Sequence, residues 1–325
     1  MKRSGVKALA RLLALCLGLA ILGVLLHTVG WRSLAEVMQA ADRRLLGIAL
    51  LLFVPQVAVM SWRWLLIGGT AQRMTFWTAC RMVLAGSSLN VVLPSKMGDL
   101  CKGFMVAGRE DTGLARGLGM AALDKLMDVM GLAAVLVVAG AFAPKAETWV
   151  LGLWAATTAG VVVLLVLMHW APLIEPLPRR KVMASLARAL NAAFRVRQHR
   201  AVWGGALVLS LVLWVLHVGQ IFIFYRAVGG AAPALAVWSR VPMGIFIGLL
   251  PVTVAGIGTR DAAFFVLMSA WDAESVIAWL GLFCTLRYVV MALLGVPAVI
   301  SLGPLVGEAL RARGQVDLPP ADGNG

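Results

Sequence analysis

Charged side chains are scarce in this chain of 325 residues: Asp, Glu, Lys and Arg make up 14% of it, whereas 61% of the residues are hydrophobic. The mean hydropathy is +0.90. The surface of a water-soluble globular protein needs more charge than this. The composition therefore excludes a soluble globular protein and predicts a membrane protein that crosses the bilayer several times.

Cysteine and histidine are also scarce, with four residues of each type. Neither type occurs in paired or clustered spacing, so we expect no disulfide framework and no metal site. A phosphate-binding P-loop sequence is absent as well. We therefore expect no cofactor, and we predict that the protein is not an enzyme.

Acidic residues are outnumbered, because 15 Asp and Glu face 29 Lys and Arg, which gives a formal net charge of +14. In membrane proteins, basic residues collect in cytoplasmic loops, so we expect lipid and not nucleic acid as the partner. The basic leader before residues 8–27 predicts an uncleaved signal anchor in the cytoplasmic (inner) membrane, with a cytoplasmic N-terminus and an outward-facing loop at 28–44. We also expect a cytoplasmic C-terminus.

Long apolar runs predict an all-α, polytopic helical fold. About six runs reach the roughly 20 residues that a spanning helix needs, at about residues 8–27, 45–67, 118–142, 149–170, 203–224 and 275–300. Two further apolar stretches, around 75–105 and 238–268, are interrupted by proline and glycine and then by charge. We predict that each of these enters the bilayer and returns as a re-entrant helical hairpin.

The same pattern predicts one transmembrane domain at residues 1–306, in which halves at about 40–142 and 201–303 form an inverted repeat. The basic segment 171–200 fits either an amphipathic helix on anionic lipid or a solvated cytoplasmic loop. The polar segment 307–325 predicts a disordered cytoplasmic tail.

The two interrupted stretches share one motif. Residues 93–99 read Leu-Pro-Ser-Lys-Met-Gly-Asp, and residues 250–261 read Leu-Pro-Val-Thr-Val-Ala-Gly-Ile-Gly-Thr-Arg-Asp. A helix that restarts after such a break presents unpaired N–H groups and the positive end of its dipole, which attract phosphate. The predicted breaks are Pro94, Gly98, Pro251, Gly256 and Gly258.

Charged residues at and near these breaks are the candidate site. We predict that the lipid headgroup is bound by Lys96, Lys102, Arg260 and Arg287, and that Asp99, Asp124, Asp128 and Asp261 compensate their charge. The alternative is a purely structural network of ion pairs that holds the hairpins in place.

Three charged positions lie within apolar spans. Asp124 and Asp128 are four residues apart and share one helix face. Arg287 lies near the middle of the last span, where a charge costs at least about 2.5 kcal/mol on insertion scales, so we expect it to pair with Asp261, Asp124 or Asp128. Arg63, near the end of the 45–67 span, is instead expected to extend to the membrane surface.

The motifs at 93–99, 123–128 and 250–261, taken in this order, resemble the lysylphosphatidylglycerol synthase transmembrane, flippase-like family over nearly the whole chain. That family more often has Arg and Glu where this sequence has Lys96 and Asp99, and Glu in place of Asp261, so the sign of each charge is kept while its reach differs. The resemblance is to the membrane half of those members that also carry a soluble aminoacyl-transferase domain.

The resemblance and the charged breaks together predict a flippase-like protein. We expect it to bind an anionic phospholipid or a polyprenyl-phosphate-linked lipid and to move it between leaflets without covalent chemistry. Two alternatives stay open: a membrane transferase, and an accessory subunit that binds enzymes of lipid or glycolipid synthesis.

Overall fold

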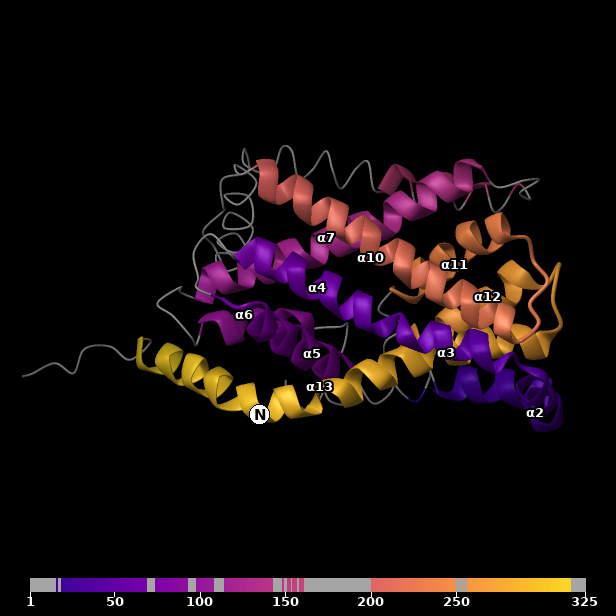
Figure 1. Cartoon of the computed structure of the whole chain (residues 1–325), viewed down its shortest axis with the longest axis horizontal. Helices are drawn as coiled ribbons and strands as arrows, with labels where there is room; N and C mark the ends of the chain where they lie inside the picture. The colour runs from indigo at the N-terminus through magenta and orange to yellow at the C-terminus, as the bar shows by residue number, and fades with distance from the viewer. Residues whose placement is uncertain are drawn as a thin grey trace, which may run out of the picture.

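The protein is described by a computed structural model that covers residues 19–68, 74–92, 98–107, 114–142, 200–249 and 256–316, with isolated positions at 16, between 148 and 160, and at 253. In these residues α-helix is the dominant element and no strand occurs, which confirms the all-α class. A helix at Leu19–Val29 comes first. The labelled helices (Figure 1) are α2 (Trp31–Ala40), α3 (Arg43–Leu51), α4 (Phe53–Gly68), α5 (Phe76–Val92), α6 (Gly98–Ala107), α7 (Leu114–Ala141), α10 (Arg200–Ala227), α11 (Ala234–Gly248), α12 (Thr259–Met268) and α13 (Glu274–Val316).

Three helical stretches of the described chain are long and apolar enough to cross a membrane: Arg43–Gly68, Ala201–Ala227 and Glu274–Leu302. They coincide with three of the predicted spans and confirm a polytopic membrane protein. Leu19–Val29 and α2 would make a fourth if they are counted as one span, although they are bent by 78°.

Two predicted segments need comment. α2 lies within the segment 28–44 that the sequence analysis predicts as a loop, so that prediction is wrong for most of the segment. The bend that precedes α2 falls at Gly30, whose φ of 84° suits a residue without a side chain. The predicted span at 149–170 lies mostly outside the described residues.

The span at Arg43–Gly68 consists of two helices. α3 begins at Arg43 because the Asp42 carboxylate accepts hydrogen bonds from the backbone N–H groups of Arg44 and Leu45, at 2.8 and 3.2 Å. α3 and α4 are separated at Leu52, three residues before Pro55. Proline has no N–H to donate to the preceding turn, which accounts for the interruption.

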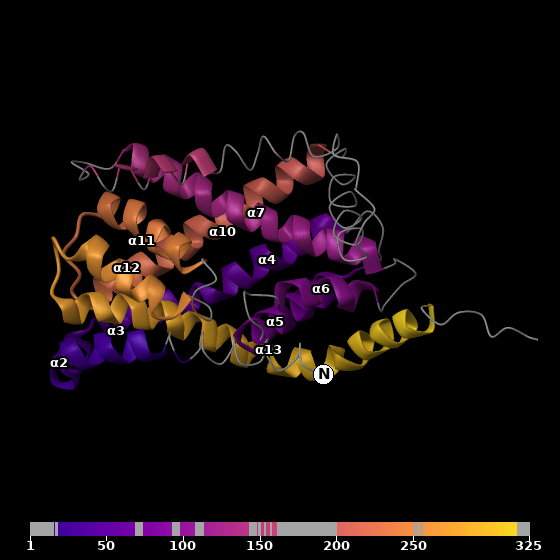
Figure 2. The same ribbon diagram turned by 180° about the vertical axis from the view of Figure 1, so that it is seen from behind.

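Both interrupted stretches fold as pairs of helices that pack on each other, α5 with α6 and α11 with α12. α12 begins at Thr259, directly after the predicted break at Gly258, whereas α6 begins at Gly98, which was itself predicted as a break and is the first residue of the helix. Pro94 and Pro251 themselves lie outside the described residues. The two pairs lie in opposite halves of the molecule along its long axis (Figures 1 and 2).

The halves of the chain pack across each other. α13 packs on α5, and α7 packs on α11, so each helix pair is covered by a long helix of the other half. α10 packs on α4 and on α7 (Figure 2). α13 also contacts both α6 and α12, so one long helix connects the helices that follow the two breaks.

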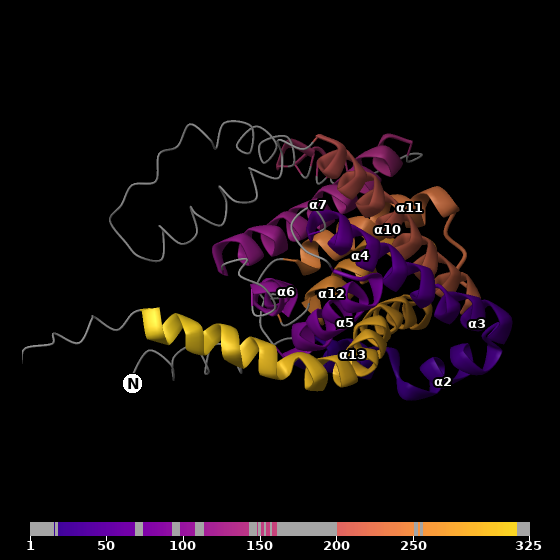
Figure 3. The same cartoon turned by 60° about the vertical axis from the view of Figure 1, so that its left-hand side comes forward.

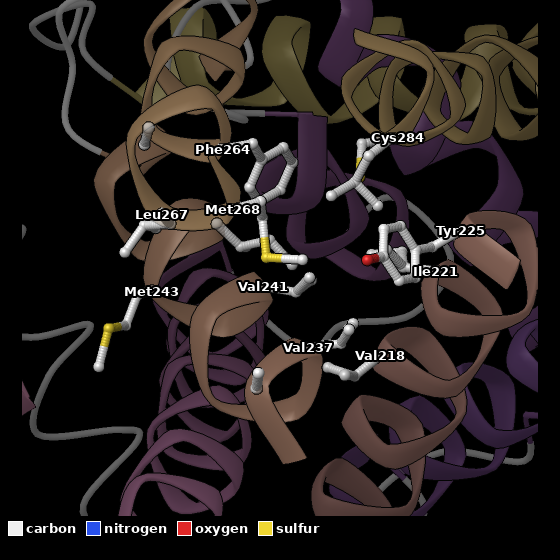
Figure 4. Close-up of a cluster of buried hydrophobic side chains, with 14 of the residues drawn as sticks. Val218, Ile221, Tyr225, Val237, Val241, Met243, Phe264, Leu267, Met268 and Cys284 are labelled. Carbon is white, nitrogen blue, oxygen red and sulfur yellow. The ribbon is translucent and has the colours of Figure 1, made fainter. Parts of the chain in front are cut away.

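Two apolar cores lie on either side of this centre. One joins α11 and α12 to α7, α10 and α13, and the other joins α4, α5 and α6 to the same three helices. Figure 4 shows the first core, in which Val237 and Val241 of α11 meet Phe264 of α12 and Ile221 of α10. The shared helices α7, α10 and α13 thus form the frame on which both helix pairs rest.

A ring of hydrogen bonds joins the α10–α11 and α12–α13 turns. The Tyr225 hydroxyl donates to Asp272 and accepts from the backbone N–H of Ala232 at 2.6 Å. The backbone N–H of Ala231 donates to the same Asp272 carboxylate at 2.7 Å. This ring holds the two turns at one end of the molecule together.

α13 extends past the other helices at its C-terminal end (Figures 1 and 3). It continues to Val316, so residues 307–316 are helical where the sequence analysis predicts a disordered tail. Residues 317–325 and nearly all of the basic segment 171–200 lie outside the described residues.

Candidate functional site

A buried carboxylate, Asp124 of α7, is the centre of a polar cluster. Its Oδ1 accepts from Arg63 Nε of α4 at 2.7 Å, and its Oδ2 accepts from Lys102 Nζ of α6 at 2.5 Å. Arg63 Nη1 also donates to Ser210 Oγ of α10 at 2.9 Å. Arg63, Lys102 and Asp124 are each no more than 3% exposed, so water does little to stabilise their charges. The two bases are balanced by Asp124 together with Asp128, 3.5 Å from Arg63, and Asp99, 3.8 Å from Lys102.

A second layer of the cluster reaches the first helix pair. Lys125 Nζ lies 3.2 Å from Asp99 Oδ2 and 3.5 Å from Asp128 Oδ2. Asn90 of α5 donates from Nδ2 to Asp99 Oδ1 at 3.0 Å and accepts from the Asp99 backbone N–H at 3.1 Å. The side chain of Asn90 therefore ties the end of α5 to the start of α6.

The expected position of Arg63 at the membrane surface is wrong. Arg63 is 2% exposed, and it contacts Asp128 at 3.5 Å as well as Asp124. Its neighbour Trp62 is 55% exposed. Successive residues of a helix point about 100° apart, so Trp62 faces outward while Arg63 faces the two carboxylates of α7.

The second helix pair contributes Arg260, the second residue of α12, and the ion pair expected from the sequence is present. Arg260 Nε and Nη2 lie 3.1 and 2.7 Å from Asp261 Oδ1. Arg260 Nη2 also donates to the Gly281 carbonyl and to Thr285 Oγ1 of α13, at 3.1 and 2.8 Å. Asp261 Oδ2 accepts from the Gly258 backbone N–H at 2.8 Å and so caps α12.

Arg287 of α13 has a different kind of partner. Its Nη2 donates to Gln56 Oε1 of α4 at 3.3 Å. In the part of the chain that the structure describes, no carboxylate oxygen lies within 4.0 Å of its guanidinium nitrogens. The expected pairing of Arg287 with Asp261, Asp124 or Asp128 is therefore wrong, because Arg260, Arg63 and Lys102 already occupy those carboxylates.

Both helix pairs line one cavity of about 120 Å³. Asn90 and Asp99 of the first pair and Ile245 and Arg260 of the second are part of its wall. The other lining residues come from α4, α5, α7, α10 and α13: Gln56, Met60, Ser87, Lys125, Asp128, Leu213, Trp214, His217, Ile221, Cys284, Arg287, Tyr288 and Met291. The cavity therefore lies where the two halves of the chain meet.

The predicted site residues divide into two groups. Asp99, Asp128, Arg260 and Arg287 line the cavity. Lys102, Asp124 and Asp261 are not part of this lining. Lys102 and Asp124 are buried partners of each other in the polar cluster, and Asp261 is the buried partner of Arg260. Lys96 lies outside the described residues.

Among the described residues, two guanidinium nitrogens of the cavity's arginines have no hydrogen-bond partner. Arg260 Nη1 and Arg287 Nε are buried, and neither has an acceptor in the described structure. A buried donor without an acceptor costs about 1–3 kcal/mol, and more when it is charged. An oxyanion in the cavity would remove this cost.

Apolar side chains complete the wall beside these arginines. Ile221 and Cys284, which line the cavity, also belong to the core that joins α10 to α11, α12 and α13 (Figure 4). An apolar surrounding of this kind strengthens the attraction between a buried cation and an anion.

Several residues of the site are neutral and so were not predicted from the pattern of charge: Gln56, Asn90, Ser210 and Gln220. The sequence feature that could have indicated them is that each is a polar side chain within a mostly apolar run. No group of three or more His, Cys, Asp or Glu side chains within the described residues is arranged to hold a metal ion.

The comparison with known proteins agrees with this architecture. No curated protein matches the chain significantly. The family model described as the lysylphosphatidylglycerol synthase TM region matches residues 11–295, which include both helix pairs and every lining residue of the cavity. The chain therefore belongs to the lysylphosphatidylglycerol synthase transmembrane-region family, a family of membrane proteins of lipid metabolism or transport.

Proposed function

We propose that this protein binds the phosphate of an anionic phospholipid or lipid-linked phosphate in the central cavity and moves the lipid between leaflets, without covalent chemistry. The observation that supports this most directly is the pair of arginines that line one cavity, each with a buried N–H that lacks an acceptor. Phosphate oxygens are strong acceptors for arginine, and the bond is charge-assisted.

The size and surroundings of the cavity suit a headgroup. Its volume of about 120 Å³ is several times the space, about 10–15 Å³ on the same kind of measure, that a cavity needs to hold one water molecule. Polar groups from both helix pairs line it, whereas the outer faces of the long helices carry exposed apolar residues such as Leu211, Val215, Leu293 and Ile300. A headgroup can thus occupy the polar centre while its acyl chains stay in the hydrocarbon outside.

The arrangement of the helix pairs supports movement between two leaflets. They lie in opposite halves along the long axis, and each packs on a long helix of the other half of the chain. We propose that they are re-entrant hairpins of an inverted repeat, with halves at about 40–142 and 201–303, which expose the cavity alternately to either side. This proposal includes residence in the cytoplasmic membrane, with both chain ends in the cytoplasm.

The test is headgroup accessibility in vesicles that contain the purified protein and a fluorescent phosphatidylglycerol, with a membrane-impermeant quencher added outside. We expect wild-type protein to make inner-leaflet lipid accessible, and Arg287→Met and Arg260→Ala to slow this by about 10-fold or more, since a hydrogen bond to a charged group contributes about 1.5–3 kcal/mol. Arg287→Met is easier to interpret than Arg260→Ala, because removal of Arg287 leaves no carboxylate without its ion-pair partner.

Arg32→Ala is the matched control. Arg32 is exposed, and its ion pair within the described residues is with Glu36 of the same helix, so its removal should leave the rate unchanged. Equal rates for wild type, Arg287→Met and Arg260→Ala would reject the roles of these arginines. Equal quenching in protein-free vesicles would reject transport itself.

A further inference from the structure

Arg287 differs from the other basic residues of the site in the kind of group that accepts its hydrogen bond. Arg63, Lys102, Lys125 and Arg260 each lie within 4.0 Å of a carboxylate. Arg287 instead donates to Gln56 Oε1, the oxygen of a neutral amide. Its positive charge is therefore positioned by the protein without being neutralised by that partner.

Gln56 is itself held in place. Its Nε2 donates to Gln220 Oε1 of α10 at 3.1 Å, and Gln220 Nε2 donates to the Ala49 carbonyl of α3 at 2.7 Å. Gln56 and Gln220 are 2% and 0% exposed, so water does not compete for these bonds. The chain of hydrogen bonds connects α13, α4, α10 and α3.

The ends of this chain fix the direction of every bond in it. The Ala49 carbonyl can only accept, and the Arg287 guanidinium can only donate. Gln220 must therefore present its NH₂ group to Ala49, and Gln56 must present its oxygen to Arg287. Both amides have a single satisfactory orientation, which holds the arginine more firmly than one isolated bond would.

We propose that Gln56, supported by Gln220, determines the charge specificity of the cavity: it orients Arg287 but leaves the neutralising charge to the ligand. This rests on the proposed function and adds to it that the bound headgroup carries a net negative charge, so a zwitterionic lipid is the poorer ligand. A carboxylate in place of Gln56 would supply the negative charge from within the protein and remove the preference.

The substitution that tests this is Gln56→Glu, which exchanges one NH₂ group for oxygen at nearly constant size. Binding is measured with purified protein in detergent, by fluorescence titration with short-chain phosphatidylglycerol and, in parallel, short-chain phosphatidylethanolamine. We expect wild-type protein to prefer phosphatidylglycerol, and Gln56→Glu to reduce the ratio of the two affinities by about 10-fold or more.

Gln56→Met is the matched control, because it removes the acceptor at similar volume and adds no charge. We expect it to weaken binding of phosphatidylglycerol while keeping most of the preference, since Arg287 stays charged but is no longer oriented. Thermal unfolding of each variant shows whether the protein is folded.

The outcomes separate the two proposals. Wild-type protein without any preference for phosphatidylglycerol would overturn the anionic-lipid function on which this inference rests. Wild-type preference that persists unchanged in folded Gln56→Glu would overturn the role of Gln56 and leave the proposed function standing. A loss of preference in Gln56→Met as large as in Gln56→Glu would also count against charge as the cause.

Discussion

Asp124 shows how single residues keep charge inside this protein. Each of its two oxygens binds a different base, Arg63 from α4 and Lys102 from α6. Taking such groups out of water costs several kcal/mol per ion, and the cost is offset only while all partners are present. The cluster therefore stabilises the contact between three helices, apart from any role in binding lipid.

Asp124→Ala should destabilise the protein strongly. Arg63 keeps Asp128 at 3.5 Å and Lys102 keeps Asp99 at 3.8 Å, but each loses its shortest contact. Breaking a buried ion pair costs about 3–5 kcal/mol, and we expect a loss near the lower end of this range. Thermal and denaturant unfolding in detergent measure it.

Glu36→Ala is the comparison for that substitution. The Arg32–Glu36 pair is exposed, with 94% and 64% of the side chains accessible, so its loss should leave the unfolding temperature unchanged. Similar unfolding temperatures for Asp124→Ala and Glu36→Ala would show that the cluster does not stabilise the fold.

Apart from Arg63 and Lys125, the charged residues of the site could be predicted from the sequence, but most of their partners could not. Arg260 and Asp261 are adjacent and form the expected pair. Arg287 binds Gln56, which is 231 positions away in the chain. The sequence shows which residues are charged. It does not show which faces of the helices meet, because that depends on packing across the whole molecule.

At the scale of secondary structure, the tip of the α11–α12 pair depends on close contact between two glycines. Gly256 has a φ of 75°, and a Cβ atom added to it would lie 2.5 Å from the Gly248 carbonyl oxygen and 2.8 Å from the Gly248 Cα. Both the backbone conformation and the space therefore require glycine at this position.

Gly256→Ala should consequently displace the start of α12 and with it Arg260. Gly229→Ala separates the two causes, because Gly229 has a φ of 83° but nothing lies within 4 Å of an added Cβ atom. We expect Gly229→Ala to cost about 1–2 kcal/mol through backbone strain alone. Gly256→Ala should cost more and should also weaken binding of phosphatidylglycerol.

Unfolding measurements and the lipid titration check both effects. If the two alanine variants were equally stable and bound lipid equally well, the contact between Gly256 and Gly248 would have no importance for the site.

The sequence predicts helices best where apolar composition alone determines that a segment is helical. Three long apolar runs become helices close to their predicted bounds, and new helices begin at Gly98 and Thr259, at or directly after predicted breaks. α2 was missed because its residues are polar and apolar in similar measure, so the helix is defined by one amphipathic face and not by an apolar run.

At the scale of the whole molecule, the halves must slide past each other if the cavity opens alternately to two sides. The α5–α13 contact crosses between the halves, and in it Ser88 Oγ donates to the Ala292 carbonyl at 2.5 Å. A covalent link at this position would prevent such sliding.

We therefore predict that a disulfide between Ser88→Cys and Ala292→Cys, in a protein with Cys16, Cys80, Cys101 and Cys284 replaced by serine, stops lipid movement without preventing lipid binding. Vesicle assays on the oxidised protein, and on the same sample after reduction, measure the effect. Each single-cysteine variant, oxidised in the same way, is the control. Full transport by the oxidised double variant would contradict movement at this contact.

The ring formed by Tyr225, Asp272 and the backbone of Ala231 and Ala232 limits which parts of the molecule can move. It fastens the outer ends of α11 and α12 to their neighbouring long helices, α10 and α13. In the proposed movement, this end of the α11–α12 pair is therefore expected to stay fixed. The largest displacement is then expected at the opposite end of the pair, where Arg260 begins α12 beside Gly256 and Gly258 and would move toward or away from a bound headgroup.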